Sequence, residues 1–106
     1  MFGKSLERRL GEITRRIKEE KEELLIAEEQ LSMLLNDADE ARIRSLVSET
    51  AISDHERRDS ARQAENMGNY CRKIKNEINR LENLQDEMLD KLTMEKNDGS
   101  SKSSYS

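Results

Sequence analysis

The residue types that most often carry chemistry are scarce in this sequence. His55 is the only histidine and Cys71 the only cysteine among 106 residues. A zinc site or a nucleophilic catalytic site needs several such groups converging on one point. The sequence also has no glycine-rich phosphate loop and no nucleophile elbow. We therefore predict that the chain is not an enzyme, and that it has no cofactor, no metal ion and no small-molecule substrate.

Charged clusters could instead bind a partner. The basic clusters are Arg8, Arg9, Arg15, Arg16 and Lys18, and Arg72, Lys73 and Lys75. Both are interleaved with acidic residues and lack aromatic neighbours, so we interpret them as solvated helix faces rather than nucleic-acid sites. A third cluster is acidic: Asp37, Asp39, Glu40, Glu49, Asp54 and Glu56. An acidic hairpin tip could hold a metal ion inside RNA polymerase, as in Gre-type factors, but such factors usually add a globular docking domain for which this sequence offers no segment.

The composition predicts long helices rather than a rounded globule. Charged residues make up 40% of the chain and hydrophobic residues 33%, with a net charge of -4. This apolar content suffices for narrow stripes on helices but not for a broad core. No apolar run is long enough to span a membrane, and residues 1–9 lack the apolar core of a signal peptide. We predict a cytoplasmic protein.

Two heptad ladders confirm the helical periodicity. In the first, ten of eleven positions are apolar: Leu6, Leu10, Ile13, Ile17, Glu20, Leu24, Ala27, Leu31, Leu34, Ala38 and Ala41. In the second, eight of ten are apolar: Ala64, Met67, Cys71, Ile74, Ile78, Leu81, Gln85, Met88, Leu92 and Glu95. Such spacing places apolar side chains on one face of each helix. Cys71 is thus expected to be a small buried hydrophobe.

The phase breaks between the two ladders. Ser53 and Glu56 have the spacing of a capping box, which predicts that a second helix begins there, with His55 in its first turn. We therefore predict a first coiled-coil arm at 1–48, a turn at 49–53, a second arm at 54–96 and a disordered polar tail at 97–106. The turn contains neither Gly nor Pro, so one unbroken helix is the alternative.

The two arms have similar lengths, as an antiparallel hairpin requires. Residue numbers of facing seam positions should then add up to 98 or to 105. We prefer 105, because it pairs the two polar seam residues, Glu20 and Gln85, whereas 98 places Glu20 against Ile78. The preferred register also pairs Ile17 with Met88.

The segment 39–56 resembles the central part of the proteins in a family of short, helical actinobacterial proteins. Within it, residues 46–56 are the distinctive part. In that family, Leu-Val-Ser-Glu-Thr is typically followed by Pro, whereas this chain has Ala51 at that position. The resemblance implies a bacterial cytoplasmic protein with a helix break at this point. It implies no activity, ligand or catalytic residue.

The predicted fold is all-α: a long antiparallel helical hairpin, or two-stranded coiled coil, that dimerises into a four-helix bundle. Apolar residues beside the seams widen the stripe and predict the oligomer interface: Leu25, Leu35, Tyr70, Leu84 and Leu89. At the turn, Leu46, Val47 and Ile52 either bind a partner protein or cap the hairpin core. We predict a protein-interaction module, meaning a scaffold, adaptor or regulator. The alternative is a transcription-associated factor that binds RNA polymerase or nucleic acid through the hairpin tip.

Overall fold

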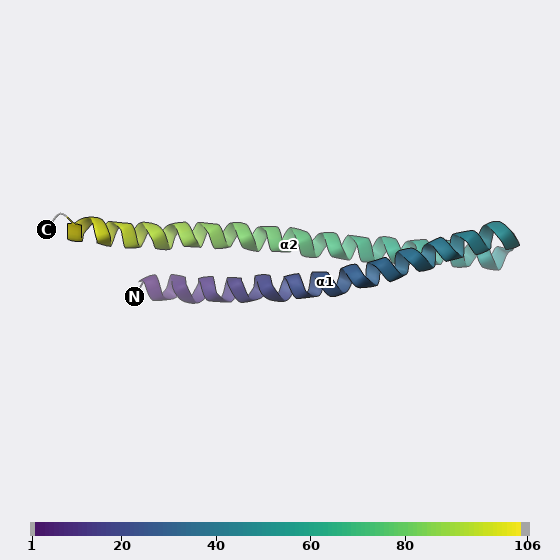
Figure 1. Ribbon diagram of the computed structural model, residues 1–106, viewed down its shortest axis with the longest axis horizontal. Helices are drawn as coiled ribbons and strands as arrows, with labels where there is room; N and C mark the ends of the chain where they lie inside the picture. The colour runs from purple at the N-terminus through teal and green to yellow at the C-terminus, as the bar shows by residue number, and fades with distance from the viewer. Residues whose placement is uncertain (1, 105–106) are drawn as a thin grey trace. The chain divides into compact units, whose positions relative to one another are not determined.

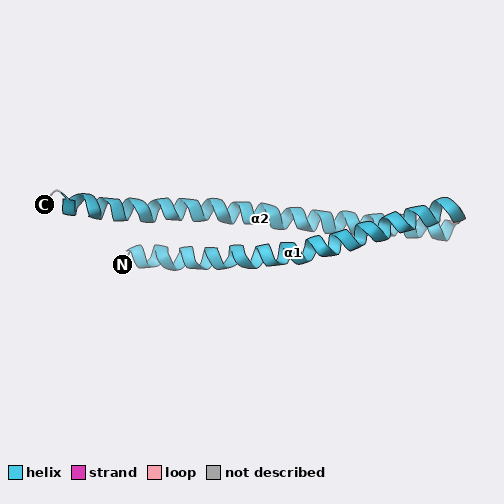
Figure 2. Ribbon diagram, viewed as in Figure 1, coloured by secondary structure: helices cyan, strands magenta, loops and turns pink. Residues whose placement is uncertain are grey.

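The protein consists of two long α-helices. A computed structural model describes the backbone of residues 2–104 and the side chains of residues 4–95. Helix α1 spans Phe2–Ser48 and helix α2 spans Ala51–Ser104 (Figure 2). No strand occurs in the described part of the chain, so the prediction of an all-α helical hairpin is confirmed. The alternative of one unbroken helix is wrong, because Glu49 and Thr50 separate the two helices.

Contacts between the helices divide the hairpin into two units. The first, here called the end unit, contains Met1–Lys21 of the N-terminal part and Asn76–Ser106 of the C-terminal part. The second, here called the turn unit, contains Glu22–Lys75 and therefore the connection between the helices. In each unit one segment of α1 lies antiparallel to one segment of α2 (Figure 1).

Large aliphatic side chains form the core of the end unit. Ile13 and Ile17 of α1 are buried against Leu81 and Met88 of α2. Two half-buried leucines, Leu10 and Leu84, pack against this cluster. Ion pairs flank the core on both sides: Arg16 with Glu77 at 3.2 Å, and Lys21 with Glu82 at 3.6 Å.

The turn between the helices is short and uses two local devices. Glu49 adopts a left-handed conformation with φ of 50°, and its N–H donates to the carbonyl of Ser45 at 3.0 Å. This arrangement is the left-handed C-terminal cap that usually contains glycine. Thr50 then caps α2 through a reciprocal pair: Ser53 N–H donates to Thr50 Oγ1 at 3.1 Å, and Thr50 N–H donates to Ser53 Oγ at 3.2 Å.

The predicted capping box at Ser53 and Glu56 is therefore displaced by three residues. Ser53 does not precede the helix but is its third residue. Its hydroxyl accepts the hydrogen bond from the N–H of the capping residue, which a Glu or Gln side chain accepts in most capping boxes. Thr50 has the hydroxyl and the spacing to act as the cap. The second arm consequently begins at Ala51 rather than at residue 54, and the connection has two residues instead of five.

The preferred register of the sequence analysis is wrong. In the end unit, the Gln85 amide donates to Thr14 Oγ1 at 3.0 Å, and in the turn unit, Gly68 lies beside Leu31. Both pairs of numbers add up to 99, which agrees within one residue with the alternative sum of 98 and not with 105. A two-residue connection centred between Glu49 and Thr50 imposes this value, because facing residues are equidistant from the turn. Gln85 thus satisfies its amide with a hydroxyl and does not pair with Glu20.

Helix α2 is longer than the sequence predicts. It continues to Ser104, whereas the polar tail was expected to be disordered from Asn97 onward. No proline interrupts residues 97–104, and proline is the residue that ends helices most strongly. In the register that the turn sets, residue 97 faces Phe2, the first residue of α1, so residues 98–104 of α2 extend beyond the end of α1. Tyr105 and Ser106 lie outside the described residues.

Candidate protein-binding surface at the turn

The seam between the helices changes character towards the turn. Its last positions on α1 are Ala38, Ala41 and Ser45, and its first positions on α2 are Ser53, Arg57 and Ser60; all six are buried or half-buried. None of them is a large apolar residue. Because alanine and serine bury little apolar area, this part of the seam contributes little hydrophobic stabilisation.

The large apolar residues of the same segment lie outside the seam. The exposed fractions are 49% for Ile43, 66% for Leu46, 82% for Val47 and 74% for Ile52. On α1, Ile43 and Val47 are four residues apart and therefore lie on one face of the helix, away from the seam that Ala41 and Ser45 occupy. The alternative that Leu46, Val47 and Ile52 cap the hairpin core is wrong, because all three are solvent-exposed.

Residues on both sides of the turn line one open groove. Ile43 and Val47 come from α1, and Ile52 comes from α2, with Arg44 and Glu56 at the rim. The hydrogen-bonded Thr50 and Ser53 also line this groove, so the cap of α2 forms part of its wall. The surface is therefore an aliphatic patch with a charge of each sign at its edge.

Sequence reasoning found two residues of this groove, Val47 and Ile52, but did not include Ile43; the third candidate, Leu46, is exposed and does not line the groove. The signal was present, because Ile43 precedes Val47 by one helical turn and falls outside the first heptad ladder. What the sequence lacked was the position of the turn, which decides that Ile52 joins the same groove as Ile43 and Val47.

Local ion pairs occupy several charges near the turn. Asp54 accepts hydrogen bonds from Arg57, the closer at 2.8 Å, and lies 3.4 Å from Arg58. These contacts, first the hydrogen bond from Arg57, lower the pKa of the Asp54 carboxyl below its ordinary value of 3.8. Asp39 is paired with Arg42 at 2.9 Å, and Glu40 lies 3.9 Å from Arg44. Half of the predicted acidic cluster is therefore neutralised by arginines of its own helix.

The structure offers no convergent reactive set among the described side chains. His55 is exposed as the fifth residue of α2, just beyond the first turn in which the sequence placed it, and Cys71 is buried in the seam. No three His, Cys, Asp or Glu residues of the described part lie close enough together to hold a metal ion. No described helix combines the length and apolar character needed to cross a membrane.

The five residues of the predicted oligomer interface are distributed over several faces. Leu25, Leu35, Tyr70 and Leu89 are exposed, whereas Leu84 packs against the core of the end unit. Within the turn unit, the Tyr70 hydroxyl donates to Glu23 at 2.7 Å on one flank of the helix pair. Heptad spacing places Leu35 on the other flank and Leu25 on the outer face of α1. Of these, Leu35 adjoins a groove between the helices, described below.

Comparisons with protein-family models, curated proteins and solved structures find no match to this chain. The resemblance of its central segment to short actinobacterial proteins therefore stays a prediction. The functional argument rests on the surface itself.

Proposed function

We propose that this protein is a non-enzymatic interaction module that binds a partner protein through the aliphatic surface at its turn. One observation carries the proposal: near the turn, small and polar residues fill the seam while Ile43, Leu46, Val47 and Ile52 face solvent. If the two helices only had to pair with each other, the fold would be more stable with the aliphatic residues in the seam and the small or polar residues facing solvent. Contiguous exposed apolar patches on soluble proteins mark interaction sites.

The surface indicates what the partner must provide. Fully covering a valine or isoleucine contributes about 1.5–3 kcal/mol, so two such anchors suffice for a weak to moderate interaction. The partner needs an apolar recess for Val47 and Ile52, with polar groups around it that can face Arg44 and Glu56. An exposed hydrophobic groove on another protein fits this description.

The competing interpretation, a factor that binds RNA polymerase or nucleic acid through its tip, receives less support. It needs acidic groups free to hold a metal ion, or a basic surface free to meet phosphates. Near the turn, Asp39 and Asp54 are each hydrogen-bonded to an arginine, which engages both kinds of charge. A protein partner that contacts the aliphatic groove requires neither.

The test is a capture experiment with matched surface variants. The full chain, a Val47→Asp/Ile52→Asp variant and a Leu25→Asp/Ile26→Asp control are each immobilised and exposed to lysate of the source cell. Leu25 is 64% exposed and Ile26 is 52% exposed, but both lie outside the groove, so the control adds the same two charges elsewhere. Captured proteins are quantified by mass spectrometry, and each candidate is then purified and titrated against the three chains.

We expect a purified partner that binds the full chain and the control equally and the groove variant at least about tenfold more weakly, since each 1.4 kcal/mol corresponds to a factor of ten. If every purified partner bound all three chains with one affinity, the turn surface would not be the binding site. A partner that binds all three chains and is released by moderate salt would instead favour the charged-surface interpretation.

A further inference from the structure

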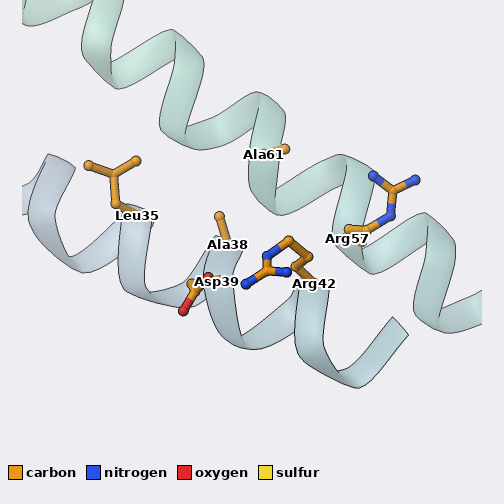
Figure 3. Close-up of a pocket in the computed structure, with 6 residues that line it drawn as sticks. All are labelled: Leu35, Ala38, Asp39, Arg42, Arg57 and Ala61. Carbon is orange, nitrogen blue, oxygen red and sulfur yellow. Dashed lines mark hydrogen bonds and ion pairs between the residues drawn. The ribbon is translucent and has the colours of Figure 1, made fainter. Parts of the chain in front are cut away.

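The turn unit contains a second apolar groove, on one flank of the helix pair. Two charged residues of α2, Glu65 and Arg72, line it. The other lining residues come from both helices: Leu31, Leu35, Ala38, Ala61, Ala64 and Gly68. Leu35, Ala38 and Ala61 also line the adjoining hollow, which ends at Arg42 and Arg57 (Figure 3). The two hollows therefore form one continuous strip along this flank. Leu35 is 54% exposed and stands at its edge.

The residues on this flank repeat every seven positions on each helix. On α1 they are Glu28, Leu35 and Arg42, and on α2 they are Asp54, Ala61, Gly68 and Lys75. Glu28 and Lys75 form an ion pair of 3.5 Å that closes the flank at that level. Seven residues nearer the turn on α1, the long side chain of Leu35 faces the small residues Ala61 and Gly68 of α2. No side chain closes the flank there, so it stays open.

Gly68 is not explained by packing inside the chain. It lies in mid-helix without a positive φ, where glycine weakens a helix relative to alanine. A Cβ added there would meet only the end of Leu31, at 4.0 Å, which is ordinary contact. The hairpin alone would accommodate alanine. The missing side chain instead deepens the open groove beside Leu35.

We propose that a second copy of this chain occupies the groove. Leu35 of each copy inserts between Ala61 and Gly68 of the other, as a knob enters a hole. The chain contains both the projecting residue and the recess that it fits, which is the self-complementarity that a two-fold symmetric dimer requires. The inference does not depend on the proposed binding of a partner at the turn.

The fit of the knob and one charge pair select the direction of the two copies. If the two-fold axis runs along the helices, α1 of one copy lies on α2 of the second at unchanged levels. Glu28 then lies near Lys75 of the second copy as well as near Lys75 of its own chain, so charges of opposite sign meet at that end of the interface. If the two copies ran in opposite directions, with the two-fold axis at the height of Leu35, Leu35 of one copy would meet Leu35 of the other, and Gly68 would meet Gly68. The recess beside Gly68 would then stay empty. The geometry therefore favours two copies that run in the same direction.

The first test measures self-association of the full chain by sedimentation equilibrium. We expect a dimer whose dissociation constant rises at least about tenfold for Leu35→Ala and for Gly68→Leu, which remove the knob and fill the hole. Gly11→Ala is the matched control, because Gly11 also lies in a helix and has no neighbouring atom within 4 Å of an added Cβ. The double variant Leu35→Ala/Gly68→Leu exchanges knob and hole and should recover most of the dimer.

Far-ultraviolet circular dichroism of each variant separates a lost interface from a lost fold. A variant that stays helical but becomes monomeric supports the proposal. A full chain that is monomeric at millimolar concentration overturns it, and so does a dimer that Leu35→Ala and Gly68→Leu leave unchanged.

The direction of the copies is tested by a spin label at the turn. Glu49→Cys in a Cys71→Ala background places one label per chain, 14 residues from Leu35, or roughly 21 Å along a helix. Copies that run in the same direction bring the two labels to within roughly 30 Å, whereas opposed copies separate them by roughly 40 Å or more. A long distance between the labels would overturn the proposed arrangement even if the dimer forms.

Discussion

The core of the end unit and the seam next to the turn use the same heptad spacing with opposite distributions of side-chain size. In the end unit, Ile13 and Leu81 are buried between the helices. Next to the turn, Ala41 and Ser53 occupy the equivalent positions, while Val47 and Ile52 are exposed. The periodicity of the sequence therefore shows where two helices are in contact, and the size of the residues at the seam shows how much that contact stabilises the fold.

This difference means that the two regions contribute unequally to stability, and under the proposed function the turn region is the one that recognises a partner. Burying a large aliphatic residue contributes about 1.5–3 kcal/mol, so most of the hydrophobic stabilisation lies where large residues fill the seam. Near the turn, hydrogen bonds among Thr50 and Ser53 fix the chain path instead. Such a division leaves the aliphatic residues near the turn free for a partner without loss of the fold.

The largest expected effect comes from a truncation in the core of the end unit. Leu81 is 1% exposed and lies among Ile13, Ile17 and Met88, so Leu81→Ala should lower the free energy of unfolding by about 2–5 kcal/mol. Val47→Ala, at an 82% exposed position, should change it by less than about 0.5 kcal/mol. Urea unfolding followed by circular dichroism measures both. Equal losses for the two variants would remove the contrast between the two regions.

The cap of α2 should have the next largest effect. Thr50→Ala removes the hydroxyl that accepts the Ser53 N–H, so we expect a loss of about 1 kcal/mol in the free energy of unfolding. Thr50→Asp should retain most of the stability, because aspartate is also a strong cap and suits the positive end of the helix dipole. The same unfolding experiment decides the matter, and an unchanged Thr50→Ala variant would mean that the cap does not stabilise the turn.

The left-handed residue at the end of α1 should show an effect of similar or smaller size and of opposite sign. Glu49 adopts a φ of 50°, a conformation that costs a non-glycine residue roughly 1 kcal/mol. Glu49→Gly should therefore raise the thermal midpoint, whereas Ser48→Gly, a control within the last turn of α1, should lower it. A destabilised Glu49→Gly variant would show that the Glu49 side chain has a stabilising role of its own.

Much of the fold could be predicted from the sequence, since heptad spacing of apolar residues depends only on helix geometry. The seam from Leu6 to Ala41 lies between the helices over most of its length, as expected. The register could not be obtained in this way, because shifts of one heptad preserve the apolar pattern. The preference for pairing Glu20 with Gln85 missed that the Thr14 hydroxyl, one position from the seam, satisfies the Gln85 amide.

The turn surface was predictable in part for the same reason. Leu46 and Val47 fall outside the first ladder, which indicated exposure or a local role. The position of the turn was needed to choose between exposure and a local role for these residues. That position was misplaced because the Ser-Asp-His-Glu segment resembled a capping box more closely than Thr50 and Ser53 did. Two overlapping cap patterns three residues apart cannot be separated by spacing alone, because each satisfies the backbone donors of a possible helix start.

The smallest expected effect tests the ion pair that joins the helices of the end unit. Hydrogen bonding from Arg80, together with the nearby charge of Arg16, lowers the pKa of the Glu77 carboxyl below its ordinary value of 4.5. A carboxyl whose pKa is lower in the folded state stabilises the fold fully above its ordinary pKa, and this contribution is lost as the pH falls through the lowered value. The loss should therefore begin below about pH 5. We expect Glu77→Gln to lower the thermal midpoint slightly at pH 7 and to reduce its fall between pH 7 and pH 3. Glu87→Gln, at an exposed position, is the control, and an identical pH profile for both variants would show that Glu77 contributes no more to the acid sensitivity of the end unit than an ordinary surface carboxylate.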